Sequence, residues 1–303
     1  MTAIEIIKPD RRKFIGGSDI AKILGIDPWK NATDLWLDKT TPPVDETDPA
    51  KRKVLRRGSR LEPYIIDLVA EEYGMKAAAR NERYQDSEVP FFACEIDCEF
   101  ILGDDARIEN GELKTVHPFK AKEWGELETD QLPLHYLAQV QWGLGVTRRE
   151  RTHVFALIGD DLRRYVVERD EPTIEAMRRR AEHFWNAFVI PKVPPPLDYA
   201  DPRGMETLKR LYPGTDGTTI EANAEHEHWR AVMATAAEMA AKYQQVVDGA
   251  QMHIMAEMGN AAILRFSDGK GFRRKEVKVR GRTQTIEPYS FISLKLVNLK
   301  DEQ

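Results

Sequence analysis

Apolar side chains recur along this chain at two different spacings. In residues 56–73, Ile65, Ile66, Val69 and Tyr73 follow one another at the three- and four-residue spacing of a helix face. Similar patterns, with capping residues at several ends, predict further helices at residues 18–24, 31–37, 119–127, 133–145, 174–188, 206–211 and 224–258. Much of the chain is therefore expected to be helical.

The spacing shortens to that of β-strands in two regions, residues 83–115 and 151–169. Short runs of apolar residues predict strands at 91–94, 99–102, 106–108, 112–116, 151–158 and 163–169, with turns at Gly103-Asp104-Asp105 and Asn110-Gly111. Helices precede, separate and follow these strands. This order predicts an α/β (α+β) fold in which helices flank a mixed central sheet.

A proline-rich segment divides the chain. Residues 191–196 hold four prolines in six positions, which stiffens the backbone and favours a boundary. We therefore expect a core at residues 1–195 and a C-terminal extension at residues 196–303. The extension is predicted to contain the helix at 224–258, which suits packing or subunit contact. Strands are then expected around Phe266, Val277-Lys278-Val279 and Phe291-Ile292, with a hairpin turn at Asp268-Gly269.

Composition narrows the class of protein. No run of eighteen apolar residues is present, so no membrane span is expected. The start of the chain lacks a secretory pattern, and Cys94 and Cys98 are its two cysteines, so we expect reduced thiols and a cytoplasmic location. The net charge of −5 argues against a nucleic-acid partner, but clustered basic residues permit local phosphate contact. These clusters are Lys51-Arg52-Lys53, Arg56-Arg57, Arg148-Arg149, Arg178-Arg179-Arg180 and Arg273-Arg274-Lys275.

The candidate chemistry centres on Asp97 and, fifteen residues later, Glu112-Leu113-Lys114. On a strand, Glu112 and Lys114 project to one side while Leu113 turns into the core. Two carboxylates suit Mg²⁺, and a neighbouring ammonium could orient a water or stabilise charge on a phosphate. This combination is typical of a nuclease, although the short pattern alone also fits an ordinary surface pairing.

Several motifs occur together in a fixed order. They are Arg11-x6-Ser18, Arg57-Gly58-x3-Glu62, Ala93-x3-Asp97, Glu112-Leu113-Lys114 and Tyr136-x2-Gln139-Val140-Gln141. Over about residues 11–190 the chain resembles the phage-type alkaline exonucleases, also called the YqaJ viral recombinase family, within the PD-(D/E)XK nuclease superfamily. The resemblance implies a restriction-endonuclease-like core and a Mg²⁺-dependent 5′→3′ exonuclease, with two metal ions and Mn²⁺ as a possible substitute. It would degrade linear double-stranded DNA from its ends to mononucleotides, leave 3′ single strands for an annealing protein, and form a ring-shaped homotrimer.

The resemblance also implies roles for individual residues at the reaction centre. Asp97 and Glu112 would bind the metals, with the Leu113 carbonyl as a further ligand. Lys114 would orient the attacking water. Glu62 would hold the second metal or that water. Read without the resemblance, Glu62 could instead cap its helix or pair with a neighbouring arginine, and Lys114 could be a lysine at a strand edge.

Other residues would contact the nucleic acid. Gln139 would lie at the edge of the site, although a neutral position on a helix surface fits it equally. Arg11 and Ser18 would grip the terminal 5′-phosphate, because a guanidinium matches phosphate oxygens, and Arg57 would contact the DNA. At the position of Glu95 the resemblance implies a serine that helps to bind phosphate, and a carboxylate there would repel the phosphate.

Two alternatives to the exonuclease remain open from the residues. One is a structure-specific or site-specific endonuclease built on the same core. The other is a non-catalytic DNA-binding or protein-binding module that has kept the fold. The presence of Glu62, Asp97, Glu112 and Lys114 together favours an enzyme over the binding module.

Overall fold

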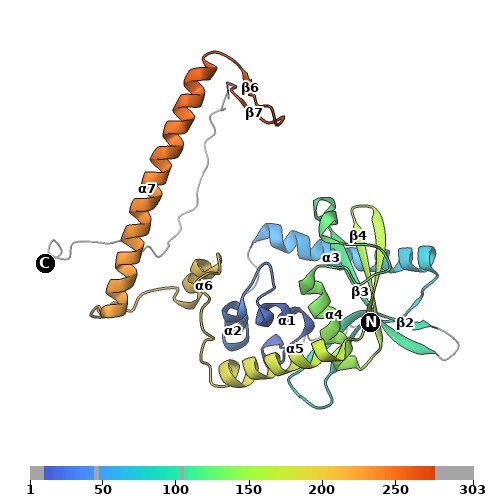
Figure 1. Ribbon diagram of the computed structural model, residues 1–303. Helices are drawn as coiled ribbons and strands as arrows, with labels where there is room; N and C mark the ends of the chain where they lie inside the picture. The colour runs from blue at the N-terminus through green and yellow to red at the C-terminus, as the bar shows by residue number, and fades with distance from the viewer. Residues whose placement is uncertain (1–9, 44–47, 103–105, 277–303) are drawn as a thin grey trace. The chain divides into compact units, whose positions relative to one another are not determined.

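The computed structural model describes residues 10–43, 48–102 and 106–276, and the chain separates into two compact units, Met1–Pro213 and Gly214–Gln303 (Figure 1). Each unit is described by itself. None of the described helices has the length and apolar content needed to cross a membrane. The expected turn at Gly103-Asp104-Asp105 and the strands expected around Val277 and Phe291 lie outside the described residues.

A mixed sheet forms the centre of the first unit, as predicted. Among the described residues its strands, in spatial order, are β1 (Ala77–Gln85), β2 (Ala93–Leu102), β3 (Arg107–Val116), β4 (Arg151–Ile158) and β5 (Asp161–Glu168). Neighbouring strands are antiparallel except β3 and β4, which run parallel. The parallel pair requires a crossover, and helix α4 lies in that crossover.

Two features of the strands differ from the prediction. The sequence did not predict β1, because apolar and polar residues do not alternate along it: most of its residues are exposed, and Asn81 has a positive φ of 55°. The expected turn at Asn110-Gly111 is wrong, because both residues lie inside β3. Gly111 pairs with Cys98, and a Cβ at this position would collide with the Cys98 sulfur. The glycine therefore permits close packing and does not make a turn.

Helices cover both faces of the sheet. In the first unit they are α1 (Gly17–Leu24), α2 (Ala32–Thr40), α3 (Pro49–Tyr73), α4 (Leu134–Thr147), α5 (Glu171–Phe184) and α6 (Gly204–Leu211). Helix α3 begins earlier than predicted, with Pro49 in its first turn and Asp48 as its cap. The helix expected at 119–127 is instead a 3₁₀ helix, Pro118–Glu123, and α5 continues into a π-helical turn, Trp185–Val189.

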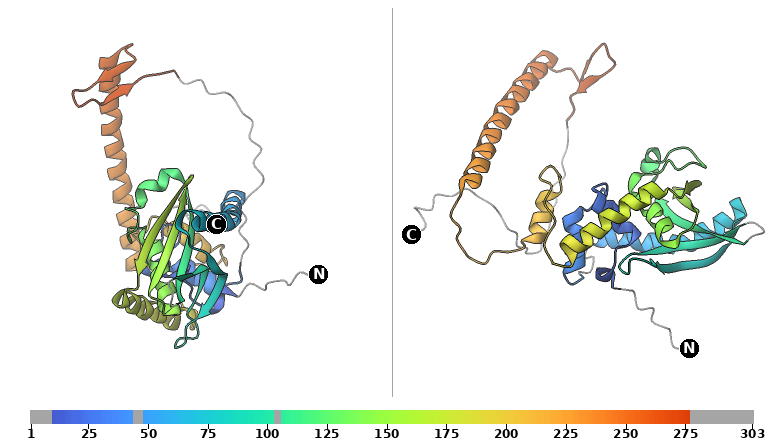
Figure 2. Two further views of the ribbon diagram at one scale, coloured as in Figure 1. Left: turned by 90° about the vertical axis from the view of Figure 1, so that its right-hand side faces the viewer. Right: turned by 60° about the horizontal axis from the view of Figure 1, so that its bottom comes forward.

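The sheet separates two hydrophobic clusters. Along β4, Val154 and Ala156 face the cluster with α4 and α5, whereas Phe155 and Leu157 face the one with α3. Successive strand residues point to opposite faces, so α3 lies on one side of the sheet and α5 on the other (Figure 2). Leu113 is buried on the α3 side, as predicted.

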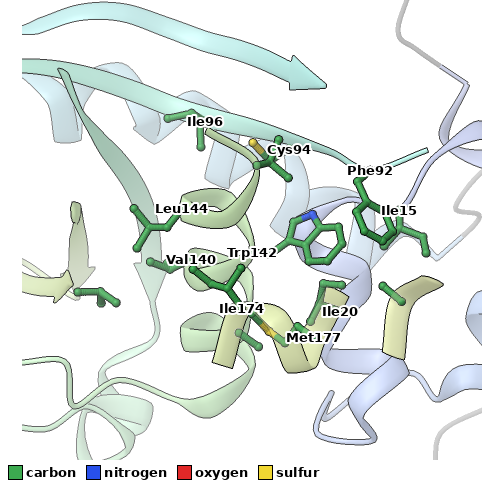
Figure 3. Packing of buried hydrophobic residues seen from close by; sticks show 14 of the residues in the cluster. Ile15, Ile20, Phe92, Cys94, Ile96, Val140, Trp142, Leu144, Ile174 and Met177 are labelled. Carbon is green, nitrogen blue, oxygen red and sulfur yellow. The ribbon is translucent and has the colours of Figure 1, made fainter. Parts of the chain in front are cut away.

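Trp142 of α4 fixes this helix against the sheet. Its indole nitrogen donates to the Ala93 carbonyl at 2.9 Å, and its ring meets that of Phe92 edge to face, with 4.6 Å between centroids. Figure 3 shows the indole in the middle of the cluster, between Phe92 and the aliphatic residues of α4. A fully buried tryptophan whose N–H is paired holds a helix in one position. Cys94 belongs to this cluster, and Cys94 and Cys98 are both buried free thiols.

Helix α6 packs with the first unit although it lies beyond the boundary expected at residue 195. The Asn31 amide donates to Asp201 at 3.0 Å and to Thr207 at 2.9 Å. Arg210 forms ion pairs with Asp34 and Asp38 of α2. The compact unit therefore extends to Pro213, past the proline-rich segment.

The second unit contains the predicted long helix, α7 (Ala224–Met258), capped by Asn223. Strands β6 (Ile263–Arg265) and β7 (Gly271–Arg273) follow and form the predicted hairpin. Gly269 adopts a φ of 82°, which agrees with its predicted place in the turn.

Candidate active site

The pairing of β2 with β3 ends beside the predicted reaction centre. The last paired residues are Cys98 and Gly111. Beyond them the Leu113 amide donates to Asp97 Oδ2 at 2.8 Å. The Asp97 side chain thus accepts a hydrogen bond from the main chain of the neighbouring strand. This bond fixes the carboxylate next to the strand that carries Glu112.

Glu112 is held by two donors. Gln139 of α4 donates its amide to Glu112 Oε1 at 2.6 Å, and the Lys114 ammonium contacts the same oxygen. Lys114 also lies 3.4 Å from Gln139 Oε1, and its ammonium is 4.9 Å from the centre of the Tyr136 ring. The predicted carboxylate, lysine and glutamine therefore form one hydrogen-bonded group that joins β3 to α4.

The charges in this group perturb one another. Burial, and then the charge of Glu112, raise the pKa of Asp97 to about 7, although Lys114 and the Leu113 amide act in the opposite direction. Burial alone would lower the pKa of Lys114, but the carboxylates of Glu112 and Asp97 outweigh it and raise the pKa above its usual value. The ammonium therefore stays charged at neutral and alkaline pH.

A cavity of about 180 Å³ connects this group with the N-terminal segment. Its walls come from the segment before α1, from the first turn of α1, from β2, β3 and β4, and from α4. The lining residues are Arg11, Phe14, Gly16, Gly17, Ser18, Cys94, Glu95, Ile96, Asp97, Asn110, Gly111, Glu112, Gln139, Val140, Gly143 and Thr152. Five of the predicted site residues, Arg11, Ser18, Asp97, Glu112 and Gln139, thus line one cavity.

Arg11 and Ser18 are positioned by a buried ion cluster that the sequence did not predict. Arg11 donates to Ser18 Oγ at 2.8 Å and lies 3.4 Å from Asp19. Burial would raise the pKa of Asp19, but Lys39, Lys22 and Arg11 outweigh it and hold the pKa below its usual range. Lys39 reaches Asp19 at 2.7 Å and the Phe14 carbonyl at 2.6 Å. The buried Asp19–Lys39 ion pair therefore holds Arg11 and Ser18 in place.

Close approach of α1 to α4 also depends on a glycine. A Cβ on Gly17 would lie 3.1 Å from Gln139 Cγ and 3.2 Å from the Gln139 carbonyl. A larger residue would push apart the two helices that carry Ser18 and Gln139. The Gly16-Gly17 pair was the sequence signal for this approach, and it is not part of the motifs used to predict the site.

Glu62 lies on α3, outside the residues that line the cavity. It is half-buried, and burial and the charge of Asp97 raise its pKa, whereas Lys114 lowers it. The charges that act on Glu62 are thus those of Asp97 and Lys114, and its role toward a metal or a water stays a prediction. Arg57, one turn earlier, is exposed, and nothing in the described structure brings it to the cavity.

The donor set fits a hard divalent cation in part. Asp97 and Glu112 line the same cavity, and each has one oxygen that makes no hydrogen bond within the described residues. Carboxylate oxygens supplemented by water and phosphate oxygens are what Mg²⁺ prefers. Within the described part of the chain, however, no three His, Cys, Asp or Glu side chains are close enough to hold a metal ion between them. The carbonyl role expected for Leu113 stays a prediction.

Two of the basic clusters have structural partners. Arg149 donates to Asn110 at 2.7 Å, and to Tyr84 and Glu99 at 2.8 Å each. Arg178 pairs with the buried Asp86. The six basic residues of the first half of α3 are exposed: Lys51, Arg52, Lys53, Arg56, Arg57 and Arg60. The surface that best suits a phosphate backbone is therefore on α3.

Comparison with known proteins agrees with the resemblance found in the sequence. Residues 8–150 match the YqaJ-like viral recombinase domain. The YqaJ protein of Bacillus subtilis (strain 168) is 34% identical over 217 residues, which are 68% of this chain and 63% of that protein. The match thus spans less than two-thirds of the relative.

Solved structures of two nucleases are similar at low sequence identity. The alkaline exonuclease LHK-Exo of Laribacter hongkongensis has a TM-score of 0.45 and 18% identity, over 66% of this chain and 94% of that chain. A phage-related exonuclease from Haemophilus somnus 129PT has a TM-score of 0.41 and 16% identity, over 59% of this chain and 96% of that chain. The sequence match and the identity to the Bacillus protein show that residues 8–150 of this chain form a YqaJ-like viral recombinase domain.

Proposed function

We propose that this protein is a metal-dependent deoxyribonuclease that degrades linear double-stranded DNA from its 5′ ends. It would release mononucleotides and leave 3′ single strands for recombination. The observation that carries the proposal is the shared cavity, which holds an anion-binding pair, Arg11 and Ser18, together with two carboxylates, Asp97 and Glu112. One cavity can thus take the end of a DNA strand and a phosphodiester next to it.

Asp97 and Glu112 are the residues that would hold Mg²⁺, with Glu62 and the Leu113 carbonyl as candidate donors for a second ion. When bound, such a cation supplies Lewis-acid polarisation of a phosphate oxygen and a more acidic water. Mn²⁺ has the same preference for oxygen ligands and is expected to substitute.

The protein groups have separable roles in this proposal. Lys114 donates a hydrogen bond to the attacking water and stabilises negative charge on the phosphate. Gln139 holds Glu112 and Lys114 in one arrangement through its amide. Arg11 and Ser18 bind the terminal phosphate and so set the distance from the strand end to the bond that is cleaved.

Assembly follows from the same proposal. A nuclease that stays on its substrate through many cycles benefits from surrounding it, so we propose a homo-oligomer, a trimer by resemblance. The 3′ strand that it leaves would be bound by a separate annealing protein. These proposals place the protein in the cytoplasm, where DNA ends are accessible.

The test compares linear with circular DNA as substrates and measures the size of the products. Purified protein is incubated with blunt 5′-phosphorylated linear duplex and with a covalently closed circle, in Mg²⁺, in Mn²⁺ and in EDTA. Mononucleotides from the linear duplex, an intact circle and no product in EDTA are expected. Cleavage of the circle would favour an endonuclease on the same core. Binding of DNA without hydrolysis in either metal would favour the non-catalytic module.

A further inference from the structure

A carboxylate lies where the cavity is expected to receive a phosphate. Glu95 precedes Asp97 by two positions on β2 and lines the same cavity as Arg11 and Ser18. Its side chain is 53% exposed, so it can meet a bound molecule. A carboxylate and a terminal phosphate repel each other, whereas a terminal hydroxyl is neutral and is not repelled. Glu95 therefore distinguishes these two kinds of DNA end by charge.

Arg83 holds this carboxylate from the neighbouring strand. The two residues are direct cross-strand partners of β1 and β2, and their charged groups are 3.8 Å apart. The Arg83 guanidinium also lies 3.9 Å from the centre of the Phe14 ring, and Phe14 lines the cavity. Contact with both Glu95 and the ring keeps Arg83 at the cavity wall. It offsets part of the negative charge of Glu95.

The remaining cations at this end are engaged in fixed contacts. Arg11 donates a hydrogen bond to Ser18 and lies near Asp19. Asp19 also forms ion pairs with Lys22 at 3.2 Å and with Lys39 at 2.7 Å. Besides this cluster, and besides Asp97 and Glu112, which line the same cavity, the charged groups near a bound terminal phosphate are Glu95 and Arg83. A change at either of these two residues alters the local charge by one unit.

We propose that Glu95, restrained by Arg83, sets the selectivity of this protein for the terminal group of DNA. It weakens the preference for 5′-phosphorylated ends, so that 5′-hydroxyl ends are also accepted. The inference rests on the proposed function to the extent that the cavity receives a DNA end. Glu95 disfavours a terminal phosphate, whereas Arg83 favours it.

The experiment measures affinity as a ratio, without hydrolysis. The full-length protein in EDTA is titrated with two hairpin duplexes that differ in a 5′-phosphate or a 5′-hydroxyl at the blunt end. Glu95→Gln should raise the ratio of phosphate to hydroxyl affinity about tenfold, the effect expected of a partly screened charge nearby. Arg83→Gln and Arg11→Gln should lower it. Glu82→Gln removes an exposed charge of β1 away from the cavity and should leave the ratio unchanged.

The ratio does not depend on the fraction of folded protein, because both duplexes meet the same sample. A Glu95→Gln ratio within twofold of the unmodified protein, or below it, overturns the inference. A protein that binds both duplexes but hydrolyses neither in Mg²⁺ refutes the proposed nuclease, while its ratios still decide the role of Glu95. A protein that binds neither duplex overturns both proposals.

Discussion

The Lys114 ammonium is surrounded by groups that keep it charged. It contacts Glu112 and Gln139 and lies over the Tyr136 ring. Its pKa is raised because Glu112 and Asp97 outweigh the opposing effect of burial. An ammonium that keeps its proton at alkaline pH can stabilise the negative charge on a phosphate that is being attacked. The same contacts also position Glu112.

Replacing Lys114 with alanine should therefore abolish hydrolysis and spare binding. We expect a loss of rate of about 10²- to 10³-fold, the usual cost of one charge-stabilising donor. Affinity for a linear duplex in EDTA should stay within a few-fold of the unmodified protein. The rate is measured with labelled duplex and the affinity by fluorescence anisotropy.

Lys120→Ala is the matched control, because Lys120 is exposed and pairs with Glu123 on a surface 3₁₀ helix. It should hydrolyse DNA at the normal rate. Normal turnover in Lys114→Ala would contradict the role proposed for this lysine.

The sequence predicted contacts between residues of one strand more readily than contacts between residues that come together from distant segments. Glu112 and Lys114 are two apart on one strand, so their proximity follows from backbone geometry. Lys39 reaches Asp19 from another helix, twenty positions away, and nothing in the local pattern indicates that contact. The convergence of Arg11 with Asp97 was inferred from the family resemblance, because no spacing rule joins segments this far apart.

At the scale of elements, the first half of α3 carries exposed positive charge. Arg56, Arg57 and Arg60 are exposed and precede Glu62 on the same helix. Each phosphate contact releases bound counterions, so affinity for DNA falls with salt in proportion to the number of contacts.

The double variant Arg56→Gln/Arg57→Gln should weaken DNA binding and flatten its salt dependence. If both arginines contact phosphates, the slope of log affinity against log salt should decrease by about two. Affinity is measured by anisotropy in EDTA at several salt concentrations. Arg179→Gln/Arg180→Gln removes the same charge from exposed positions of α5 and serves as control. Equal slopes in both double variants would exclude α3 as the DNA-binding surface.

The β1–β2 hairpin that carries Glu95 and Asp97 is tied to α5 by a buried ion pair. Burial would raise the pKa of Asp86, but the Arg178 guanidinium and the amides of Val89 and Glu88 outweigh it and lower the pKa. A lowered pKa in the folded protein contributes stability above the unfolded value of about 4. That contribution is lost as the pH falls through the folded pKa.

Asp86→Asn should therefore destabilise the protein in a pH-dependent way. At pH 7 we expect a loss of about 2 kcal/mol in the free energy of unfolding, because the buried charge pair is broken. The difference from the unmodified protein should shrink below about pH 4, where Asp86 begins to be protonated in the unfolded chain. Thermal unfolding followed by circular dichroism at pH 7, 5 and 3.5 measures this. A difference that stays constant over this range would contradict the assignment.

The elements that the sequence predicted well are those with a clear apolar face. Helices α4 and α7 and strands β4 and β5 lie close to where their patterns placed them. Strand β1 was missed because an edge strand exposed on both faces has no alternation to detect. Asn110-Gly111 was misread because the same dipeptide that favours a turn also permits a strand to pass close to Cys98 and Phe100. In β1 and at Asn110-Gly111, tertiary contacts therefore decided the structure, and the local sequence pattern did not.

At the scale of the whole molecule, the overall charge of −5 conceals an uneven distribution. The acidic groups Glu95, Asp97 and Glu112 gather in one cavity, while basic residues collect on α3. A nuclease needs both, since carboxylates bind cations and arginines bind the phosphate backbone. Net charge therefore does not exclude the proposed DNA partner, because the relevant quantity is local potential.

The extent of the first unit can be tested by truncation, because two boundaries are available. The proline-rich segment predicts an end near residue 195, whereas the contacts of α6 place Pro213 inside the unit. A chain that ends at 195 loses the Arg210 partner of the buried Asp34, and the Asp201 and Thr207 partners of Asn31. An uncompensated buried carboxylate is costly, so α6 should matter for stability.

We expect the 1–195 chain to be less stable than the 1–213 chain by about 3 kcal/mol, because the buried Asp34 carboxylate loses its Arg210 and Thr207 partners. For a unit of this size that corresponds to a melting temperature lower by about 6 to 12 °C. Arg210→Gln within the 1–213 chain should reproduce part of the loss, because it removes one partner and leaves the helix. Equal melting temperatures for the two truncated chains would mean that α6 contributes nothing and that the prolines mark the true boundary.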